Sequence, residues 1–315
     1  MPKAAVPFLA GKDSPEAGAW LSALRHAMPD ERIVAFEDLN EGERSEATIA
    51  IVANPEPADL SRLPRLCWVH SVWAGIERLL ANLGDSRLQI VRLLDPRLAA
   101  TMAEAVLAWT LFLHREMPAY ARQQAQQLWR SRPYTRPEQR TVGLLGLGAL
   151  GSASAERLLA ARFKVCGWSR QRKSLPGVEC FAGEVGLEEM LGKTNILICL
   201  LPLTLETRGL LNMARLALLP SGASLINFAR GPIIDDEDLR AALDSGQLDH
   251  AVLDVFAHEP LPADRWPWRH PGVTVLPHCS APTDHETAAQ IVAANIRRYR
   301  ETGELPACVN VARGY

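Results

Sequence analysis

Short apolar runs alternate with a segment of helical periodicity along the first third of the chain. Residues Glu16–Ala27 place their apolar side chains at helical spacing between two such runs. An alternation of strands and helices is the pattern of an α/β layered domain. The predicted strands are Ala4–Ala10, Arg32–Phe36, Ala47–Ala53, Leu66–Val72 and Leu88–Leu94.

The alternation becomes stronger from Thr141 onward. Here the strands are nearly uninterrupted apolar runs, which is typical of strands buried on both faces of a parallel sheet. Ala149–Arg162 and Glu286–Arg300 have the spacing of helices. The predicted strands are Thr141–Leu147, Phe163–Trp168, Asn195–Leu201, Ala223–Phe228, Ala251–Phe256 and Val273–Leu276.

A chain of 315 residues exceeds the size at which single cores usually stop growing, so two domains are expected. An apolar helix, Thr101–Arg115, precedes the polar stretch Ser131–Arg140, whose two prolines mark a loop before a new domain. We expect crossings between the domains near Asp95–Thr101 and Ser280–His285. The fold prediction is two Rossmann-like or flavodoxin-like α/β domains with parallel sheets and an interdomain cleft, residues 1–100 plus 284–315 and residues 101–283.

Charge and composition narrow the class of protein. The formal net charge is −2, so there is no basic excess to bind nucleic acid or an anionic membrane surface. No apolar run of about 20 residues is present to span a membrane, and Pro7 interrupts the apolar start, which argues against a signal peptide. The six cysteines form no C-x-x-C pair and read as reduced, mostly buried thiols. We therefore expect a cytoplasmic protein, without a metal site, that binds small molecules or copies of itself.

A glycine-rich turn follows the strand at Thr141. The sequence TVGLLGLGALG places Gly146, Gly148 and Gly151 in a G-x-G-x-x-G pattern between a strand and a helix. These glycines permit a tight turn, close approach of a pyrophosphate and close packing of helix on strand. The amides of the first helical residues, Ala149 and Leu150, then face the phosphates. The domain 101–283 is predicted to bind a dinucleotide, although a purely structural glycine turn is the alternative.

The end of the next strand predicts which dinucleotide binds. NAD binding normally requires an acidic residue there, about 20 residues after the glycines, and this chain has Ser169 instead. Arg170, Arg172 and Lys173 follow. A hydroxyl beside cations attracts a 2′-phosphate, whereas a carboxylate repels it. The sequence thus favours NADPH, with NADH as a weaker possibility; a solvated basic loop is the alternative interpretation.

Polar residues follow three later strands of the same domain. Arg230 ends LINFARGP, Asp254 and Glu259 lie in LDVFAHEPLP, and His278 lies in LPHCSAPT. Because ligands bind outside the carboxyl ends of strands in open α/β sheets, we expect these side chains to form one site.

These motifs together resemble the D-2-hydroxy acid dehydrogenase family. The tracts WSRQRKSLPGV and AALDSGQ and the C-terminal ARGY are similar to its glyoxylate/hydroxypyruvate reductase A branch. The resemblance implies an enzyme that reduces small 2-keto acids, glyoxylate and hydroxypyruvate, with a nicotinamide cofactor. It further implies that the residues 1–100 plus 284–315 hold the substrate. The residues expected near the cofactor also include Leu201, Pro202, Thr207, Ala229 and Ser280.

The chemistry explains the residue types. Reduction adds hydride to a carbonyl carbon and a proton to its oxygen, and a histidine paired with a carboxylate is a suitable acid near neutral pH. His278 and Glu259 are predicted to be that pair. By the family pattern, Arg230 binds the substrate carboxylate and the developing negative charge, and Asp254 binds the nicotinamide carboxamide. His258, beside Glu259, is the less favoured histidine, and Cys279 is predicted to be a packed residue with no nucleophilic role.

In the first domain, the loop VWAGI is where the family binds the substrate carboxylate through backbone amides. Ala74 and Gly75 match those positions, and Trp73 and Leu98 are candidate pocket walls; an ordinary turn is the alternative. Trp129 resembles a tryptophan that reaches the neighbouring subunit's cleft, or it anchors a dimer interface. We predict a homodimer, because Thr101–Arg115 is more apolar than one exposed face allows and the family pairs through this region.

Two other functions stay open at this point. One is a reductase of larger 2-keto acids, since the residues after His278 depart from the common family pattern. The other is a dinucleotide-sensing interaction protein built on the same scaffold. The joint presence of Arg230, Glu259 and His278 argues against the second, because a binding protein needs no acid pair.

Overall fold

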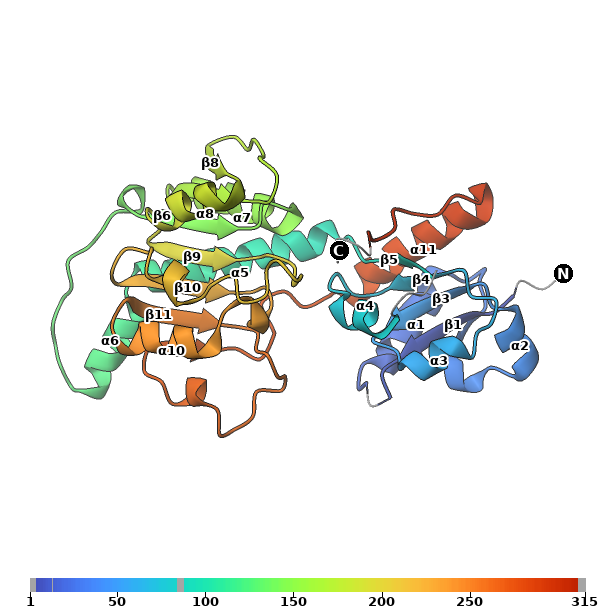
Figure 1. Ribbon diagram of the computed structural model, residues 1–315. Helices are drawn as coiled ribbons and strands as arrows, with labels where there is room; N and C mark the ends of the chain where they lie inside the picture. Colours follow the sequence, from blue (N-terminus) through green and yellow to red (C-terminus); the bar gives the residue numbers. More distant parts are fainter. Residues whose placement is uncertain (1–3, 13, 84–87, 311–315) are drawn as a thin grey trace. The chain divides into compact units, whose positions relative to one another are not determined.

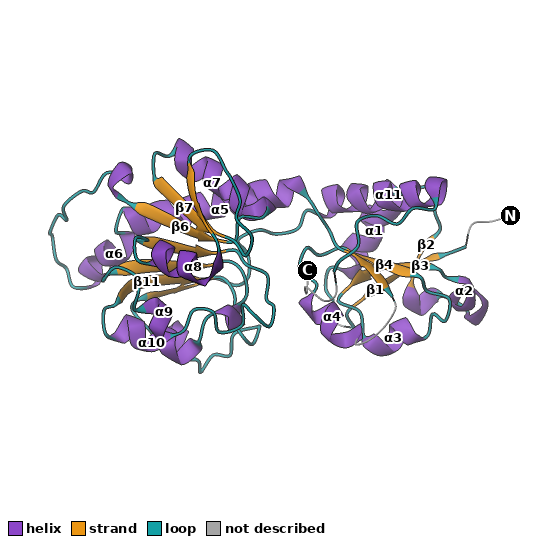
Figure 2. Cartoon of the chain, turned by 45° about the horizontal axis from the view of Figure 1, so that its top comes forward, coloured by secondary structure: helices purple, strands orange, loops and turns teal. Residues whose placement is uncertain are grey.

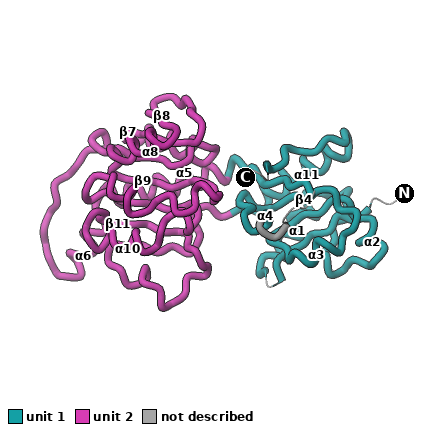
Figure 3. Tube along the Cα trace, in the orientation of Figure 1, with its two compact units in different colours: residues 1–97, 283–315 teal, residues 98–282 magenta. Residues whose placement is uncertain are grey.

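The structure is a computed structural model that describes residues 4–12, 14–83 and 88–310. The chain divides into two compact units, Met1–Arg97 with Thr283–Tyr315 and Leu98–Pro282 (Figure 3). We call them unit 1 and unit 2 and describe each by itself. The C-terminal ARGY motif at 312–315 lies outside the described residues.

Unit 1 is a parallel five-stranded sheet in the order β2-β1-β3-β4-β5, the flavodoxin-like order (Figure 1). Alternate residues of β3 point to opposite faces, so Ile49 and Ile51 pack under helices α1 and α11, whereas Ala50 and Val52 pack on the side of α3 and α4. The elements are β1 (Val6–Ala10), α1 (Ala17–Ala27), β2 (Ile33–Ala35), α2 (Glu41–Glu46), β3 (Ile49–Ala53), α3 (Pro57–Ser61), β4 (Trp68–Ser71), α4 (Glu77–Leu83), β5 (Gln89–Val91) and α11 (His285–Thr302).

Unit 2 is a parallel seven-stranded sheet in the order β12-β11-β10-β9-β6-β7-β8, in which the strand order reverses between β6 and β9. Helices cover both faces (Figure 2): α5 and α7 one face, and α8, α9 and α10 the other. The elements are α5 (Pro96–His114), α6 (Met117–Ala125), β6 (Thr141–Leu145), α7 (Ala149–Ala160), β7 (Lys164–Trp168), β8 (Val178–Phe181), α8 (Gly183–Leu191), β9 (Ile196–Cys199), α9 (Met213–Leu216), β10 (Ala223–Asn227), α10 (Asp236–Asp244), β11 (Leu248–Leu253) and β12 (Val273–Val275).

The predicted fold class, two parallel α/β domains, is confirmed by these sheets. The start expected for the apolar helix is wrong: the helix predicted at Thr101–Arg115 begins at Pro96. Proline is favourable in the first helical turn, and the Asp95 carboxylate accepts from the backbone amide of Arg97 at 2.8 Å. The first crossing between the units therefore lies inside a helix.

Among the described residues, no helix combines the length and the apolar character that crossing a membrane requires.

Candidate active site

The glycine turn lies at the carboxyl end of β6, where the strand order reverses. Gly146 has a φ of 105°, a conformation that favours glycine. A Cβ at Gly146 would lie 2.9 Å from the carbonyl oxygen of Leu200, and one at Gly151 would lie 1.9 Å from that of Gly146. Both glycines are therefore required by backbone packing between β6, α7 and the end of β9.

Gly148 differs from these two glycines. It has an ordinary extended conformation, and a Cβ there would meet no protein atom within 4 Å. It is the N-cap of α7 and offers no side chain to the amides of the first turn, which have no partner within the helix. The turn thus leaves open space in front of a helix N-terminus, the arrangement that binds phosphate.

The loop after β7 carries the residues predicted to select NADPH. Ser169 Oγ donates to the Gln171 carbonyl at 2.7 Å, and Arg170 Nη1 lies 4.0 Å from a carboxylate oxygen of Glu206. Lys173 does not extend away from the site, because its Nζ donates to the Leu147 carbonyl at 2.7 Å. Lys173 therefore ties this loop to the glycine turn, and Arg172 is exposed.

The loop after β9 contains Leu201, Pro202 and Thr207. The Thr207 hydroxyl donates to the Pro202 carbonyl at 2.7 Å and accepts from the Thr204 amide at 2.8 Å. This side chain closes the loop on itself. Its predicted contact with the cofactor, like those of the other two residues, stays a prediction.

Arg230 follows β10 and is half-buried, with Nη1 donating to the Ala229 carbonyl at 2.6 Å. Asn227, which sequence reasoning missed, holds the same loop: its Nδ2 donates to the Arg230 carbonyl and its Oδ1 accepts from the Ala229 amide, both at 3.1 Å. Gly231 packs on the next loop, since a Cβ there would lie 2.2 Å from the carbonyl carbon of Phe256. In the sequence, the signal for Asn227 was an uncharged polar residue at the end of an apolar strand.

Glu259 and His278 form the predicted pair. His278 Nδ1 lies 2.7 Å from Glu259 Oε2, and Oε1 of the same carboxylate accepts from the Phe256 amide at 2.8 Å. The carboxylate is thus held from the β11 side and holds the imidazole in turn. About half of the His278 side chain is exposed, 52 %, and Nδ1 is the ring nitrogen that Glu259 engages.

Asp254 holds the backbone of the histidine loop. It is buried, and its carboxylate accepts from the amides of Cys279 at 2.7 Å and Ser280 at 3.0 Å, while its carbonyl accepts from the His278 amide at 3.0 Å. His278 has a φ of 53°, an uncommon conformation for a residue with a side chain. The Asp254 carboxylate is therefore engaged by backbone amides, and its contact with a nicotinamide carboxamide stays a prediction.

The electrostatics of the pair match its geometry. The hydrogen bond that His278 donates to Glu259 raises the pKa of His278 above its ordinary value, against burial and the nearby Arg230 charge, which lower it. Burial alone would raise the pKa of Glu259, but the hydrogen bonds from His278 and from the Phe256 amide outweigh it, so that pKa is lowered. The arrangement favours an imidazolium–carboxylate pair.

Other histidines have different surroundings. His270 Nε2 lies 3.1 Å from Asp244 Oδ1, and its Nδ1 accepts from the Gly272 amide at 3.0 Å, which stabilises the start of β12. His285 belongs to unit 1 and packs against Trp20 at 4.3 Å between ring centroids. His258 is exposed. His278, and none of these three histidines, is paired with Glu259.

The predicted substrate loop of unit 1 follows β4. The Trp73 amide donates to the Ser71 hydroxyl at 3.1 Å, and the Trp73 ring meets Trp20 edge to face at 5.4 Å. Contacts of Ala74 and Gly75 with a substrate stay predictions. Leu98, expected in the first domain, is the first residue of unit 2 and lies in α5.

Comparisons with known proteins identify the family of this chain. Residues 107–280 match the family model of the D-isomer specific 2-hydroxyacid dehydrogenase, NAD binding domain. Glyoxylate/hydroxypyruvate reductase A of Salmonella paratyphi B is 37% identical over 303 residues, which cover 94% of this chain and 96% of that protein.

Solved structures give the same result. A D-isomer specific 2-hydroxyacid dehydrogenase from Xanthobacter autotrophicus Py2, in complex with NADPH and MES, has a TM-score of 0.91 and 38% identity over 99% of both chains. The NADPH-dependent glyoxylate/hydroxypyruvate reductase from Sinorhizobium meliloti, in complex with NADP and sulfate, has a TM-score of 0.89 and 34% identity over 98% of this chain and 100% of the other. The chain therefore belongs to the D-isomer specific 2-hydroxyacid dehydrogenase family, and its resemblance to the glyoxylate/hydroxypyruvate reductase A branch is confirmed.

Proposed function

We propose that this protein uses NADPH to reduce small 2-keto acids, glyoxylate to glycolate and hydroxypyruvate to D-glycerate. The observation that carries the proposal is the His278 Nδ1–Glu259 Oε2 contact of 2.7 Å in the unit that also has the glycine turn. The relatives named as glyoxylate/hydroxypyruvate reductases support the substrate class.

The residues present fit a dinucleotide. Gly148 has no packing reason to be glycine, so the open space beside it suits a pyrophosphate on the N-terminus of α7. The Ser280 hydroxyl is buried and has no hydrogen-bond partner within the described residues, which suits a polar group of a bound nicotinamide. Relatives in complex with NADPH or NADP support the same cofactor.

Each catalytic side chain has a distinct task. When bound, NADPH supplies the hydride. His278 uses Nδ1 for Glu259, so Nε2 is the atom that gives a proton to the carbonyl oxygen of the substrate. Glu259 keeps the ring oriented and favours its charged form. Arg230 is a permanent cation whose planar group suits a carboxylate and the developing oxyanion.

A panel of 2-keto acids tests this function. We expect the protein to oxidise NADPH with glyoxylate and hydroxypyruvate. The reaction is measured as the loss of absorbance of the reduced nicotinamide. Higher kcat/KM with phenylpyruvate or long-chain 2-keto acids would favour a reductase of larger substrates. NADPH binding without turnover on any member would favour the dinucleotide-sensing alternative.

Arg170 is expected to select NADPH through its charge on the 2′-phosphate. Charge-assisted hydrogen bonds contribute about 1.5–3 kcal/mol each. Arg170→Ala should therefore raise the KM for NADPH about 10- to 100-fold and leave that for NADH within about twofold. Both are measured by steady-state kinetics, with Arg162→Ala as the control at an exposed arginine of the same unit that pairs with Glu138. Equal losses with both cofactors would show that Arg170 does not read the phosphate.

We also propose a homodimer formed through the end of α5 and the segment that follows it. Large apolar side chains are exposed there: Leu111, Met117, Tyr120, Leu128, Trp129 and Tyr134. Trp129 is fully exposed, and complete solvent exposure of a tryptophan side chain is typical of an interaction site.

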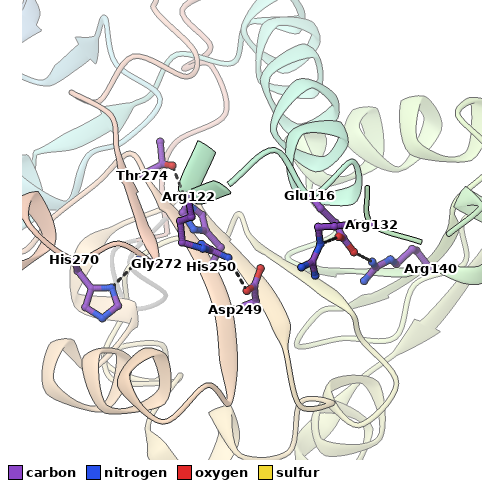
Figure 4. Close-up of polar contacts among 9 residues, drawn as sticks. All are labelled: Glu116, Arg122, Arg132, Arg140, Asp249, His250, His270, Gly272 and Thr274. Carbon is purple, nitrogen blue, oxygen red and sulfur yellow. Dashed lines mark hydrogen bonds and ion pairs between the residues drawn. The ribbon is translucent and has the colours of Figure 1, made fainter. Parts of the chain in front are cut away.

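The segment that presents Trp129 is anchored at its base. Glu116 pairs with both Arg132 and Arg140 (Figure 4). The distance from Arg140 Nη2 to Glu116 Oε1 is 3.5 Å. The Arg132 amide donates to the Tyr120 hydroxyl at 3.1 Å. These contacts hold the base of the segment on unit 2 while its tip stays accessible to a second copy.

Light scattering at micromolar concentration should give twice the monomer mass of 34.6 kDa. Trp129→Ala removes the largest exposed apolar side chain and should shift the equilibrium toward monomer. Trp268→Ala, at a tryptophan that is also exposed, serves as the control and should leave the mass unchanged. A wild-type protein of monomer mass would refute the dimer.

A cytoplasmic location is proposed from cysteine chemistry. All six cysteines are free thiols, as expected for a reducing compartment. The prediction that most are buried is wrong, because of the six only Cys166 and Cys199, which lie in strands β7 and β9, are buried, whereas Cys67 and Cys279 are exposed.

A further inference from the structure

Asn227 is the last residue of β10, and its side chain is almost completely buried at 1 % exposure. Both ends of its amide are used. Nδ2 donates to the Arg230 carbonyl and Oδ1 accepts from the Ala229 amide, each at 3.1 Å. One side chain thus fixes both flanks of the short loop that presents Arg230.

The same residue is joined to the histidine loop through its backbone. The Asn227 carbonyl accepts from the Asp254 amide at 3.1 Å, and the Asp254 carboxylate holds the amides of Cys279 and Ser280. Asn227 and Asp254 therefore form a continuous buried chain of hydrogen bonds between the Arg230 loop and the His278 loop. The packing of Gly231 on Phe256 links the two loops a second time.

The Arg230 guanidinium is bound to Ala229, a residue that Asn227 also holds. Arg230 Nη1 donates to the Ala229 carbonyl at 2.6 Å, and the Ala229 amide is the group bound by Asn227 Oδ1. An arginine side chain is long and flexible, so its placement needs a fixed backbone beneath it. Misplacing a catalytic group by about 1 Å can reduce the rate about 100-fold.

We propose that Asn227 is a positioning residue that sets the place of Arg230 relative to His278. The proposal rests on the function proposed above. It assigns Asn227 no contact with substrate or cofactor, because its amide is buried and already bound at both ends.

Asn195 provides a matched control. It immediately precedes β9, at the opposite end of the same sheet, and its Oδ1 accepts from the Thr141 amide at 2.9 Å. Asn195→Ala and Asn227→Ala each delete one side-chain amide that binds backbone at a strand end. A merely structural role predicts a loss of thermal stability and unchanged kinetics for both.

The first arm measures kinetics and cofactor binding. Asn227→Ala is expected to lower kcat/KM for hydroxypyruvate about 10- to 100-fold, with the NADPH dissociation constant, from fluorescence titration, within about twofold of the wild type. Asn195→Ala should leave kcat/KM unchanged. If Asn227→Ala does not fold, Asn227→Ser takes its place, because it is uncharged and its single short hydroxyl cannot replace both hydrogen bonds of the amide. Kinetics equal to those of Asn195→Ala would overturn the proposal.

The second arm is a double-mutant cycle with Arg230→Ala. If Asn227 acts through Arg230, adding Asn227→Ala to Arg230→Ala should cost less than about a further twofold in kcat/KM. Losses that multiply in the double variant would overturn the proposal.

Oxalate binding separates this inference from the proposed function. Oxalate, a small anion with the adjacent carboxylates that an arginine fork binds, is titrated calorimetrically in the presence of NADP⁺. Asn227→Ala should weaken oxalate binding as Arg230→Ala does, whatever the turnover with 2-keto acids. An inactive wild-type protein with this binding pattern would refute only the function, and unchanged oxalate affinity in Asn227→Ala would refute the inference.

Discussion

Replacing His278 by alanine is expected to lower kcat for 2-keto acid reduction about 10²- to 10⁴-fold, the usual contribution of a positioned general acid. The reason is the geometry of the pair, in which Glu259 holds Nδ1 and leaves Nε2 as the proton donor. NADPH affinity should stay close to that of the wild type, because the glycine turn lies at the end of a different strand. Steady-state kinetics at saturating NADPH, with a separate NADPH titration, measure both effects.

The pH dependence of the wild type gives a second measure of the same residue. Reduction requires the protonated imidazole, so its rate should fall as pH rises through the pKa of His278, which Glu259 raises above the ordinary value of about 6.5. Oxidation of the hydroxy acid requires the neutral ring and should rise over the same range. Glu259→Gln removes the carboxylate that favours the charged ring, so both profiles should move to lower pH.

His258→Ala is the control for this prediction, because His258 is exposed and directly precedes Glu259. It should retain nearly full activity and an unchanged pH profile. Loss of activity in His258→Ala together with an active His278→Ala would show that His278 is the wrong histidine for the acid. Activity in both variants would mean that neither histidine supplies the proton.

Arg230→Ala is expected to lower kcat/KM for glyoxylate and hydroxypyruvate about 10²- to 10³-fold, the loss that follows removal of one donor to a developing oxyanion. Arg230→Lys should recover only part of this, since lysine keeps the charge and loses the planar fork. Arg240→Ala is the matched control, because Arg240 is half-exposed and pairs only one turn away with Asp244. Kinetics of Arg230→Ala equal to those of Arg240→Ala would remove Arg230 from the mechanism.

The pH profile of Arg230→Ala should move in the opposite direction to that of Glu259→Gln. The charge of Arg230 lowers the pKa of His278, whereas Glu259 raises it. Removing the arginine therefore raises the pKa of His278, and the falling limb for reduction should lie at higher pH. A shift of both variants in the same direction would contradict the placement of these two charges around one imidazole.

The positions of strands and motifs could be predicted from the local pattern of apolar and polar residues. The apolar runs that predicted Thr141–Leu147 and Asn195–Leu201 contain β6 and β9, because strands buried on both faces need continuous apolar sequence. The ends of the strands were harder to predict from the sequence. The strand predicted at Ala251–Phe256 is Leu248–Leu253, which leaves Asp254 just beyond the strand, because pairing with β10 and β12 fixes where β11 ends.

Several roles in the site depended on contacts between distant segments. Asn227 and Asp254 are ordinary polar residues at strand ends in the sequence, and their partners on neighbouring loops decide what they hold. Lys173 was predicted from its charge to face a phosphate, and the structure adds its contact with the Leu147 carbonyl, 26 residues away. Only folding brings such atoms within hydrogen-bond distance.

The sequence by itself determined the fold class, the glycine turn and the residue types that hydride chemistry needs, because each follows from periodicity or from side-chain chemistry. The tertiary structure decided how the predicted pair is made, since His278 lies 19 residues from Glu259 and contacts it through Nδ1, whereas the sequence neighbour His258 is exposed. The reason is that parallel strands place their carboxyl ends at one edge of the sheet, where β11 and β12 bring Glu259 and His278 together.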